Sequence, residues 1–291
     1  MLINSKLNWI VCACLIACFL GGGFAHAETK QRLISLAPHL TELTFAAGAD
    51  DALVGVVAYS NYPIQAQQLP EIGDAFRFDM EAIVSLQPTI ALAWRGGTPS
   101  AVAEQLQSLG IEVIWVTTDS FKDIAEALRQ IGRVAGDESV AEQAAADFLA
   151  TIDRFEARQD QTLNEEPVAI FYQISDRPLY TFGGRHVINE VFEICGGENI
   201  FATLDTEALS VDREAVLLRQ PDLIIAGLPE PSDSADHDPL SQWIPHQQGA
   251  LSDTQFHRVD PNLLVRPTAR IVEGIETLCA LTQSISQPST P

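Results

Sequence analysis

Short apolar runs alternate with helical patterns along most of the chain after residue 30. In the first part, runs with the length of buried strands lie at 33–36, 53–57, 90–94 and 112–116. Segments 41–47 and 99–109 are typical of helices, and Gly110 ends the second one. Alternation of this kind predicts a mostly parallel sheet with helices on both faces.

One helix–strand segment occurs twice. FDMEAIVSLQPTIALA at 78–93 returns as VDREAVLLRQPDLIIA at 211–226, an offset of 133 residues. In each copy an aspartate, Asp79 or Asp212, can cap a helix, and a glutamate two residues later favours the positive end of the helix dipole. Each helix stops before a proline, and a buried strand follows. The repeat suggests two similar lobes, although helix–proline–strand units are also common in α/β proteins generally.

Two longer helical patterns separate the copies. Ser120 and Asp123 resemble a capping box at the start of the first helix, which Gly136 ends. The second helix is expected over 138–158. Its apolar residues at helical spacing are Val140, Ala144, Phe148, Ile152 and Phe155. A helix of that length reaches about 30 Å, so it is either a strut between two lobes or an ordinary surface helix.

Strands and helices alternate again in the second part of the chain. Segment 168–174 is predicted to be a strand, 187–194 a helix that ends at Gly196–Gly197, 229–239 a polar loop, and 267–281 a final helix. The organisation that follows is an N-terminal α/β lobe over 28–118, a linking helical segment over 119–163, and a C-terminal α/β lobe over 164–291.

Residues 1–27 have the features of a secretory signal peptide. Lys6 is the only charge there, and an apolar run from Trp9 to Leu20 precedes the cleavage pattern Ala25-His26-Ala27. The run is too short to span a bilayer comfortably. A lipoprotein-type cleavage with Cys18 as the lipid anchor is an alternative, although the apolar residues beyond Cys18 argue against it.

Removal of this leader leaves two cysteines, Cys195 and Cys279. In an exported protein two cysteines favour one disulfide, and two separate buried thiols are the alternative. The net charge of −22 becomes −23 once Lys6 is removed. Such an acidic surface repels nucleic acid and anionic lipids, and no transmembrane segment remains after residue 27.

The common catalytic motifs are missing from the sequence. No lysine follows a glycine-rich loop, the turn at Ala37-Pro38-His39 lacks the dinucleotide-binding glycines, and no Gly-x-Ser-x-Gly elbow occurs. The histidines are scattered and form no metal-ligand spacing, although convergence in space stays open. We therefore predict no catalytic residue, no metal and no cofactor. A secreted α/β hydrolase or transferase is the alternative from another class of protein.

Open α/β sheets bind ligands at the carboxyl ends of their strands. The loops expected there are 37–39, 58–62, 94–98, 175–182 and 262–266, and they offer Tyr59, Tyr62, Trp94, Tyr180 and Arg266. Flat rings and one fixed cation suit a large, partly aromatic ligand with polar edges. Gly96 and Gly97 are expected to let the backbone approach that ligand closely. Each aromatic residue taken singly could instead be a packing residue.

At these residues the sequence resembles the cobalamin-binding periplasmic proteins (BtuF) of the cobalamin ABC importer. The resemblance covers essentially all of 28–291 in the same order, and AWRGG with CGGENIF is a fairly specific pair. The matching segments are Ala37-Pro38 with Thr41-Glu42-Leu43, YSNYP at 59–63, AWRGG at 93–97, EICGGENIF at 193–201, and Arg266 with Arg270-Ile271.

The resemblance implies a class III periplasmic binding protein, in which one long backbone helix joins two α/β lobes and permits only a small hinge motion. It implies a periplasmic carrier, monomeric when free, that delivers a corrinoid to an ABC permease dimer with its ATPase subunits. Glu81 and Glu214 match the glutamates that dock on the permease, one per lobe, and Cys195 and Cys279 match the family's disulfide. The residues implied to contact the ligand are Tyr59, Trp94, Asn262, Leu263, Leu264, Val265 and Arg266.

Some positions depart from the family pattern, which has more aromatic residues at the ligand. Ala75 precedes Phe76, Ala208 stands where a tryptophan is usual, and 262–265 read Asn-Leu-Leu-Val rather than acidic–aromatic. Less stacking surface weakens corrin binding or widens specificity. The alternative ligand for the same fold is haem or a ferric siderophore, with Tyr59 facing the iron.

Overall fold

The computed structural model describes residues 31–74, 77–135, 138–159, 166–227 and 238–286. They belong to one compact unit that begins at Gln31. The predicted leader with Cys18, Gly136, Ala75 and nearly all of the predicted loop 229–239 lie outside the described residues. No helix within the described ranges has the length and apolar character needed to cross a membrane.

The first sheet contains four parallel strands in the order β2-β1-β3-β4. They are β1 (Leu33–Ser35), β2 (Leu53–Val56), β3 (Ile90–Trp94) and β4 (Glu112–Val116). Consecutive residues of the central strands face opposite sides. Leu33 and Leu92 join one buried cluster, whereas Ile34 and Ala91 join another on the other face. This is why the strands appear in the sequence as continuous apolar runs.

Helices cover this sheet on both faces. They are α2 (Pro38–Ala46), α3 (Met80–Ser85) and α4 (Ser100–Ser108), with short 3-10 turns η1 (Asp50–Ala52) and η2 (Ile64–Gln68). The helix expected at 41–47 begins three residues earlier, because Pro38 stands in its first turn, where a missing N–H costs no hydrogen bond.

The second sheet is also parallel, in the order β11-β10-β5-β8. Its strands are β5 (Val168–Gln173), β8 (Gly197–Asn199), β10 (Leu223–Gly227) and β11 (Gln255–Val259). A small antiparallel sheet lies beside it: β6 (Ser175–Asp176), β7 (Leu179–Phe182) and β9 (Ala208–Ser210). The helical elements of this second half are α7 (Ile188–Ile194), α8 (Arg213–Leu217), η3 (Pro239–His246), α9 (Pro261–Leu264) and α10 (Ile271–Ser286). The expected fold class, two mostly parallel α/β halves, is confirmed.

The duplicated segment forms the same structure twice. It builds α3 with β3 and α8 with β10, and each strand is internal to its sheet. Gln87 and Gln220, which occupy the same repeat position, both have left-handed backbone with φ of 47° and 45°. The helix starts differ, however. Asp79 accepts a hydrogen bond from the Ala82 N–H at 2.9 Å, whereas Asp212 makes no side-chain cap, so the prediction of a cap at Asp212 is wrong.

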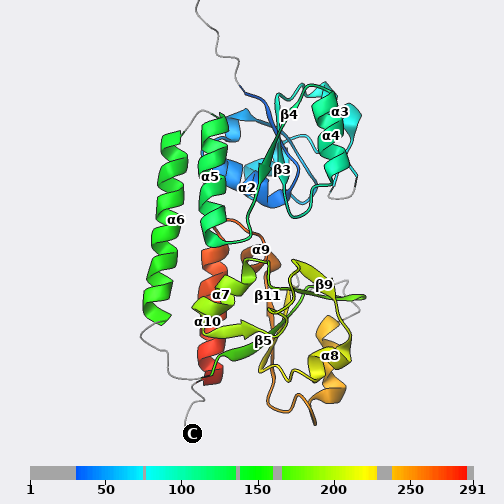
Figure 1. Cartoon of the computed structure of the whole chain (residues 1–291), viewed down its shortest axis with the longest axis vertical. Coiled ribbons are helices and arrows are strands. Elements are labelled where there is room, and N and C mark those ends of the chain that lie inside the picture. The colour runs from blue at the N-terminus through cyan, green and yellow to red at the C-terminus, as the bar shows by residue number, and fades with distance from the viewer. Residues whose placement is uncertain (1–30, 75–76, 136–137, 160–165, 228–237, 287–291) are drawn as a thin grey trace, which may run out of the picture. The chain divides into compact units, whose positions relative to one another are not determined.

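Two helices link the halves: α5 (Phe121–Ala135) and α6 (Glu138–Gln159). The expected capping box of α5 is present, since the Asp123 N–H donates to Ser120 Oγ at 3.1 Å. Helix α6 runs beside α5 and also packs against α7 of the second half (Figure 1). It therefore contacts elements of both halves, as expected of a strut.

The buried face of α6 is rotated from the expected one near its start. Ala141 and Ala145 are buried there instead of Val140 and Ala144, and Val140 is 44% exposed. Further along the helix, Phe148, Ile152 and Phe155 are buried as expected. A small side chain lets two helices approach closely, which suits alanine rather than valine at the α5–α6 contact.

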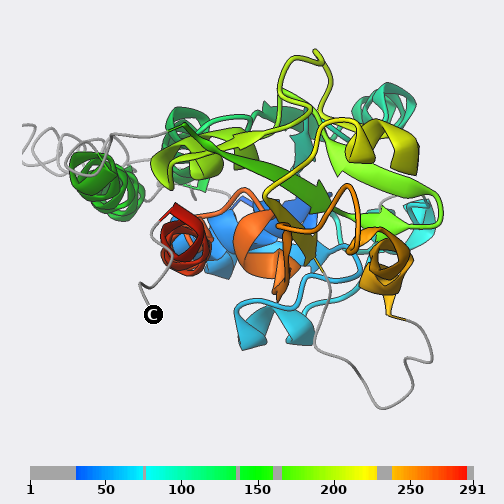
Figure 2. The same ribbon diagram turned by 90° about the horizontal axis from the view of Figure 1, so that it is seen from below.

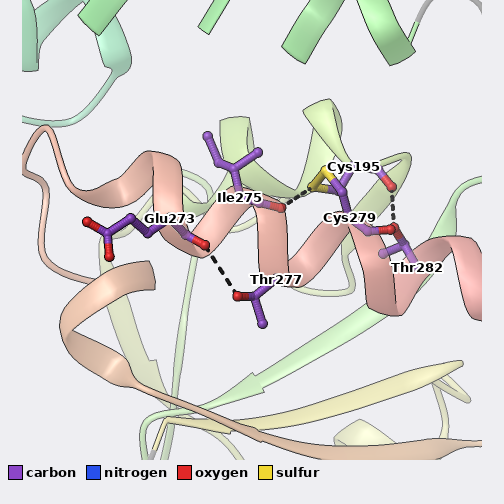
Figure 3. The surroundings of a disulfide bond; sticks show 6 residues. All are labelled: Cys195, Glu273, Ile275, Thr277, Cys279 and Thr282. Carbon is purple, nitrogen blue, oxygen red and sulfur yellow. Dashed lines mark hydrogen bonds between the residues drawn. A yellow bond between two sulfur atoms is a disulfide. The ribbon is translucent and has the colours of Figure 1, made fainter. Parts of the chain in front are cut away.

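A disulfide joins Cys195, at the end of α7, to Cys279 in α10 (Figure 3). Thr282 stands beside it and donates its hydroxyl to the Cys195 carbonyl at 2.6 Å and to the Cys279 carbonyl at 3.1 Å. The bond closes a separation of 84 residues. The predicted disulfide is confirmed, and the alternative of two separate thiols is wrong.

Candidate functional site

Trp94 ends β3, at the edge where the parallel strands of the first sheet finish. Its ring meets that of His39 edge-on, with 4.9 Å between centroids. A Cβ placed on Gly97 would lie 2.4 Å from this indole, and one on Gly96 would lie 2.7 Å from it. The glycines are therefore required by Trp94 itself. The expectation that they leave room for a ligand is corrected, because the indole fills that room.

The loop after β2 presents a tyrosine to solvent. Tyr59 is 79% exposed and has φ of 65°, a left-handed conformation that is uncommon for an aromatic residue. Tyr62, three residues later, lies under the guanidinium of Arg270, 3.6 Å from the ring centroid. Of the two expected tyrosines, Tyr59 thus has a free face, whereas Tyr62 is held by a cation–π contact.

Arg266 holds this loop in place. Its Nη1 donates to Glu42 Oε1 at 2.9 Å and to Asn61 Oδ1 at 2.7 Å, and its Nη2 donates to the Tyr59 carbonyl at 3.1 Å. Arg270 donates through Nε and Nη2 to the two carboxylate oxygens of Glu42, both at 3.0 Å. Glu42 lies in α2 of the first half, and its side chain is only 3% exposed. We call Glu42, Arg266 and Arg270 the Glu42 clamp.

The predicted contact segment 262–266 is partly helical. Asn262 and Leu264 belong to α9, where Asp260 caps the helix by accepting from the Asn262 N–H. Leu264 is buried in the core. Asn262, Leu263 and Val265 are partly exposed. Three of the four residues before Arg266 are therefore accessible to a ligand, and Leu264 is not.

Two buried histidines lie near this edge, and both are neutral. Burial lowers the pKa of His39 to about 3, with further contributions from Arg266 and His186. Burial likewise lowers the pKa of His186 to about 3. The His186 ring stacks on Phe182 at 3.9 Å, and its Nδ1 accepts from the Ile188 N–H. The described residues contain no group of three or more metal-ligating side chains.

Glu207, which sequence reasoning missed, approaches Trp94 from the second half. Its Oε2 lies 2.6 Å from the Cβ position of Gly96. Burial, and secondarily Asp119, raise the pKa of Glu207 to about 7, whereas Arg185 opposes the shift. The pKa of Asp119 is itself raised by burial and by Asp123. Glu207 stands in an aperiodic stretch before β9, so the only signal in the sequence near it is Ala208, which departs from the family pattern.

The two predicted docking glutamates are exposed. Glu81 and Glu214 lie in the first turns of α3 and α8. Neither has a salt-bridge partner within the described ranges. Both helices lie on the side away from α6 in two views at right angles (Figures 1 and 2). The structure therefore leaves both carboxylates accessible, on two helices that lie on the same side of the compact unit.

Two parallel α/β halves, a long linking helix and an aromatic edge define a class of binding protein. The family model described as periplasmic binding protein matches residues 33–240. The chain therefore belongs to the periplasmic binding protein family, and it is a binding protein rather than an enzyme.

Within that family, the chain is similar to proteins named vitamin B12-binding protein. The one from Vibrio parahaemolyticus is 33% identical over 260 residues, which cover 89% of this chain and 92% of the relative. The one from Yersinia pestis is 33% identical over 266 residues, 90% of each.

Solved structures of periplasmic binding proteins are also similar to this chain over most of its length. The crystal structure of the periplasmic vitamin B12 binding protein BtuF of Vibrio cholerae matches with a TM-score of 0.78 and 31% identity, over 88% of this chain and 98% of that one. The periplasmic heme-binding protein RhuT from Roseiflexus sp. RS-1, in apo form, matches with a TM-score of 0.75 over 89% of this chain and 100% of that one. Its identity is 22%, so this second likeness extends to the fold alone.

Proposed function

We propose that this protein is the periplasmic substrate-binding protein of an ABC importer and that it carries cobalamin or a related corrinoid. The observation that carries the proposal is the likeness to vitamin B12-binding proteins across about nine tenths of the chain. The aromatic edge formed by Trp94 and the Tyr59 loop supports it, because stacked rings suit a large flat ligand.

Tyr59, Trp94, Asn262, Leu263 and Val265 are the residues that we propose contact the corrin and its side groups. Leu264 supports them from the core. Arg266 belongs to the same set, because a guanidinium has five N–H groups and only three of them donate to described residues. Two remain for carbonyl oxygens on the ligand, so Arg266 both holds the Tyr59 loop and faces the ligand.

The whole-chain organisation belongs to the same proposal. Residues 1–27 act as a leader that is cut during export, and the mature protein consists of lobes 28–118 and 164–291 with the link 119–163. It is monomeric when free, and the corrinoid is its cargo rather than a cofactor. Its partner is an ABC permease dimer with ATPase subunits, on which Glu81 and Glu214 dock, one from each lobe.

Tyr59→Ala tests the ligand site, because an exposed side chain can be removed without disturbing the core. Loss of one stacked ring is expected to weaken cyanocobalamin binding by about 0.5–1.5 kcal/mol, up to roughly tenfold, measured by calorimetry. Trp94→Phe is the second variant, since phenylalanine keeps part of the volume that Gly97 accommodates. Leu109→Ala, at the end of α4, is the control for loss of an exposed apolar side chain.

Unchanged affinity in both aromatic variants would contradict the site. The fold-level likeness to haem-binding proteins defines a second measurement. The absorbance spectrum of protein purified from cells supplied with corrinoid and haem together distinguishes a bound corrin from a bound haem or ferric siderophore. A corrin spectrum supports the proposal. A haem spectrum would contradict the proposed ligand and leave the fold and the family unchanged.

A further inference from the structure

A carboxylate from the second half lies against the proposed aromatic edge of the first half. The Cβ position on Gly96 lies 2.6 Å from Glu207 Oε2 and 2.7 Å from the Cε2 and Cζ2 atoms of Trp94. Glu207 therefore stands beside the edge of the indole. Since a ring stacked on Trp94 brings its side groups to this edge, Glu207 faces the periphery of the proposed ligand rather than its flat face.

The charge around Glu207 is predominantly negative. Asp119 raises the pKa of Glu207, and Asp123 in turn raises that of Asp119. The opposing cation is Arg185, whose side chain is 61% exposed and lies 3.4 Å from Asp205. A solvated cation that is already paired offsets a half-buried carboxylate only weakly. A negatively charged ligand group would thus meet net repulsion here.

Other basic side chains near this edge do not act on Glu207. His39 is neutral. Arg266 and Arg270 share the single carboxylate of Glu42, which leaves one net positive charge in the clamp. The charges that shift the pKa of Glu207, however, are those of Asp119 and Arg185. Nε2 of His39 and Nε1 of Trp94 are both buried and have no hydrogen-bond partner among the described residues. The His39 side chain is more than nine-tenths buried. Buried polar atoms are nearly always paired, so two unpaired atoms in adjacent rings indicate a place that a polar group of the ligand completes.

We propose that Glu207, with Asp119 behind it, selects ligands whose ring periphery carries carboxamides and disfavours ligands whose periphery carries carboxylates. An amide N–H donates to the Glu207 carboxylate, whereas a ligand carboxylate brings a like charge into a half-buried place. The inference rests on the proposed function and narrows it. Amidated corrinoids are accepted, and tetrapyrroles with free acid side chains, haem among them, are disfavoured.

The same contact gives carboxylate ligands a distinctive dependence on pH. The pKa of Glu207 is about 7, raised by burial and Asp119 and opposed by Arg185. A ligand carboxylate raises that pKa further, so its binding takes up a proton and weakens as the pH rises through 7. An amide that donates to the ionised form favours the deprotonated state, so the affinity of an amidated ligand does not fall over that range.

The test compares cobinamide with cobyrinic acid, because the two share a corrin ring and differ in amides against carboxylates. With cobalt in the same ligation state, calorimetry at pH 8 is expected to show cobinamide binding the wild-type protein at least about tenfold more tightly. Glu207→Gln is expected to reduce that ratio about tenfold, chiefly by tightening cobyrinic acid. It is also expected to remove the loss of cobyrinic acid affinity between pH 6 and pH 8.

Glu276→Gln is the matched control, since it makes the same charge change at an exposed position of α10. Its ratio should equal that of the wild type. Equal binding of the two corrinoids by the wild type, or a ratio that Glu207→Gln leaves unchanged, would overturn the inference and leave the proposed function intact. If cobinamide and cobalamin both fail to bind the wild type, the proposed function and the inference fall together.

Discussion

Glu42 is a carboxylate held almost wholly out of water by two guanidinium groups. Its side chain is 3% exposed, and those of Arg266 and Arg270 are 16% and 18% exposed. A buried ion pair is a modest source of stability when it is complete, but loss of one partner leaves a charge without compensation. Removing one charge of the Glu42 clamp is therefore expected to change the stability of the protein more than the complete clamp contributes to it.

Glu42→Gln is expected to lower the free energy of unfolding by about 2–4 kcal/mol, slightly under the range for a fully buried pair because both arginines keep some exposure. Chemical denaturation measures the change. Glu142→Gln is the control, because it breaks the close but exposed pair with Arg129 and should leave the unfolding midpoint unchanged. Similar losses in the two variants would mean that the clamp contributes no more than a surface pair.

The sequence indicated which residues lie at the candidate site better than it indicated which residues they contact. Tyr59 and Trp94 were correctly expected near strand ends, because the apolar periodicity locates those ends. Arg266 instead follows α9 and the edge strand β11, which the sequence did not reveal. The partners were not predictable, since Arg266 and Glu42 are 224 positions apart and Glu207 reaches Gly96 from the other half. Contacts over such separations leave no periodic signal along the chain.

At the scale of elements, the two copies of the duplicated segment form the same helix and strand but differ at the start of the helix. Both copies turn through a left-handed glutamine before the proline and strand. Only the first copy has a side-chain cap, however, since Asp79 accepts from the backbone of α3 and Asp212 does not accept from that of α8. The repeat therefore provides an internal comparison of what a helix cap contributes.

Asp79→Ala is expected to lower the free energy of unfolding by about 1 kcal/mol, within the range of 0.5–2 kcal/mol for loss of an N-cap. Asp212→Ala should have a smaller effect, because no cap bond is lost. Urea denaturation of the two single variants measures both changes. An equal loss at the two positions would show that helix-dipole attraction, which both aspartates share, outweighs the hydrogen bond.

The disulfide ties α7 to α10. In the chain-entropy model, a bond that closes a loop of this length stabilises a protein by roughly 4–5 kcal/mol. Reduction is therefore expected to lower the unfolding midpoint of the wild-type protein, measured by thermal denaturation with and without a phosphine reductant. The double variant Cys195→Ser with Cys279→Ser is the control. Its midpoint should match that of the reduced wild type and should not respond to the reductant.

Element prediction succeeded where the periodic signal was long enough. β3 and β4 were predicted to the residue, and α6 to within one residue of its end. The strands β6, β8 and β9 span only two or three residues each, too few to show alternation. β11 reads Gln-Phe-His-Arg-Val at a sheet edge and is only partly buried, so it lacks the apolar run that revealed its neighbours.

At the scale of the whole molecule, two similar halves each expose a glutamate in the first turn of the duplicated helix. Glu81 and Glu214 belong to a chain with a net charge of −22. The proposed docking on a permease dimer requires a receptor with matching positive charges. Exposed charges of this kind chiefly set the rate and orientation of association and are sensitive to salt.

Glu81→Lys with Glu214→Lys is expected to abolish binding to the permease complex reconstituted in lipid discs, while cobalamin affinity stays unchanged. Each single variant should lose an intermediate amount, because one receptor half stays engaged. Glu112→Lys, at an exposed position where β4 begins, controls for the change in net charge that each single variant makes. Full binding by the double variant would remove both glutamates from the docking surface.

Helix α10 connects the disulfide to the proposed ligand site. Arg266 and Arg270 grip the first half just before this helix, and Cys279 anchors the helix to α7 about two and a half turns further on. Arg266 also donates to the Tyr59 carbonyl, in the loop that we propose contacts the ligand. Loosening the helix at its anchored end should therefore shorten the residence time of the cargo, and stopped-flow chase experiments on oxidised and reduced protein would show how far thiol chemistry governs the speed of hand-over.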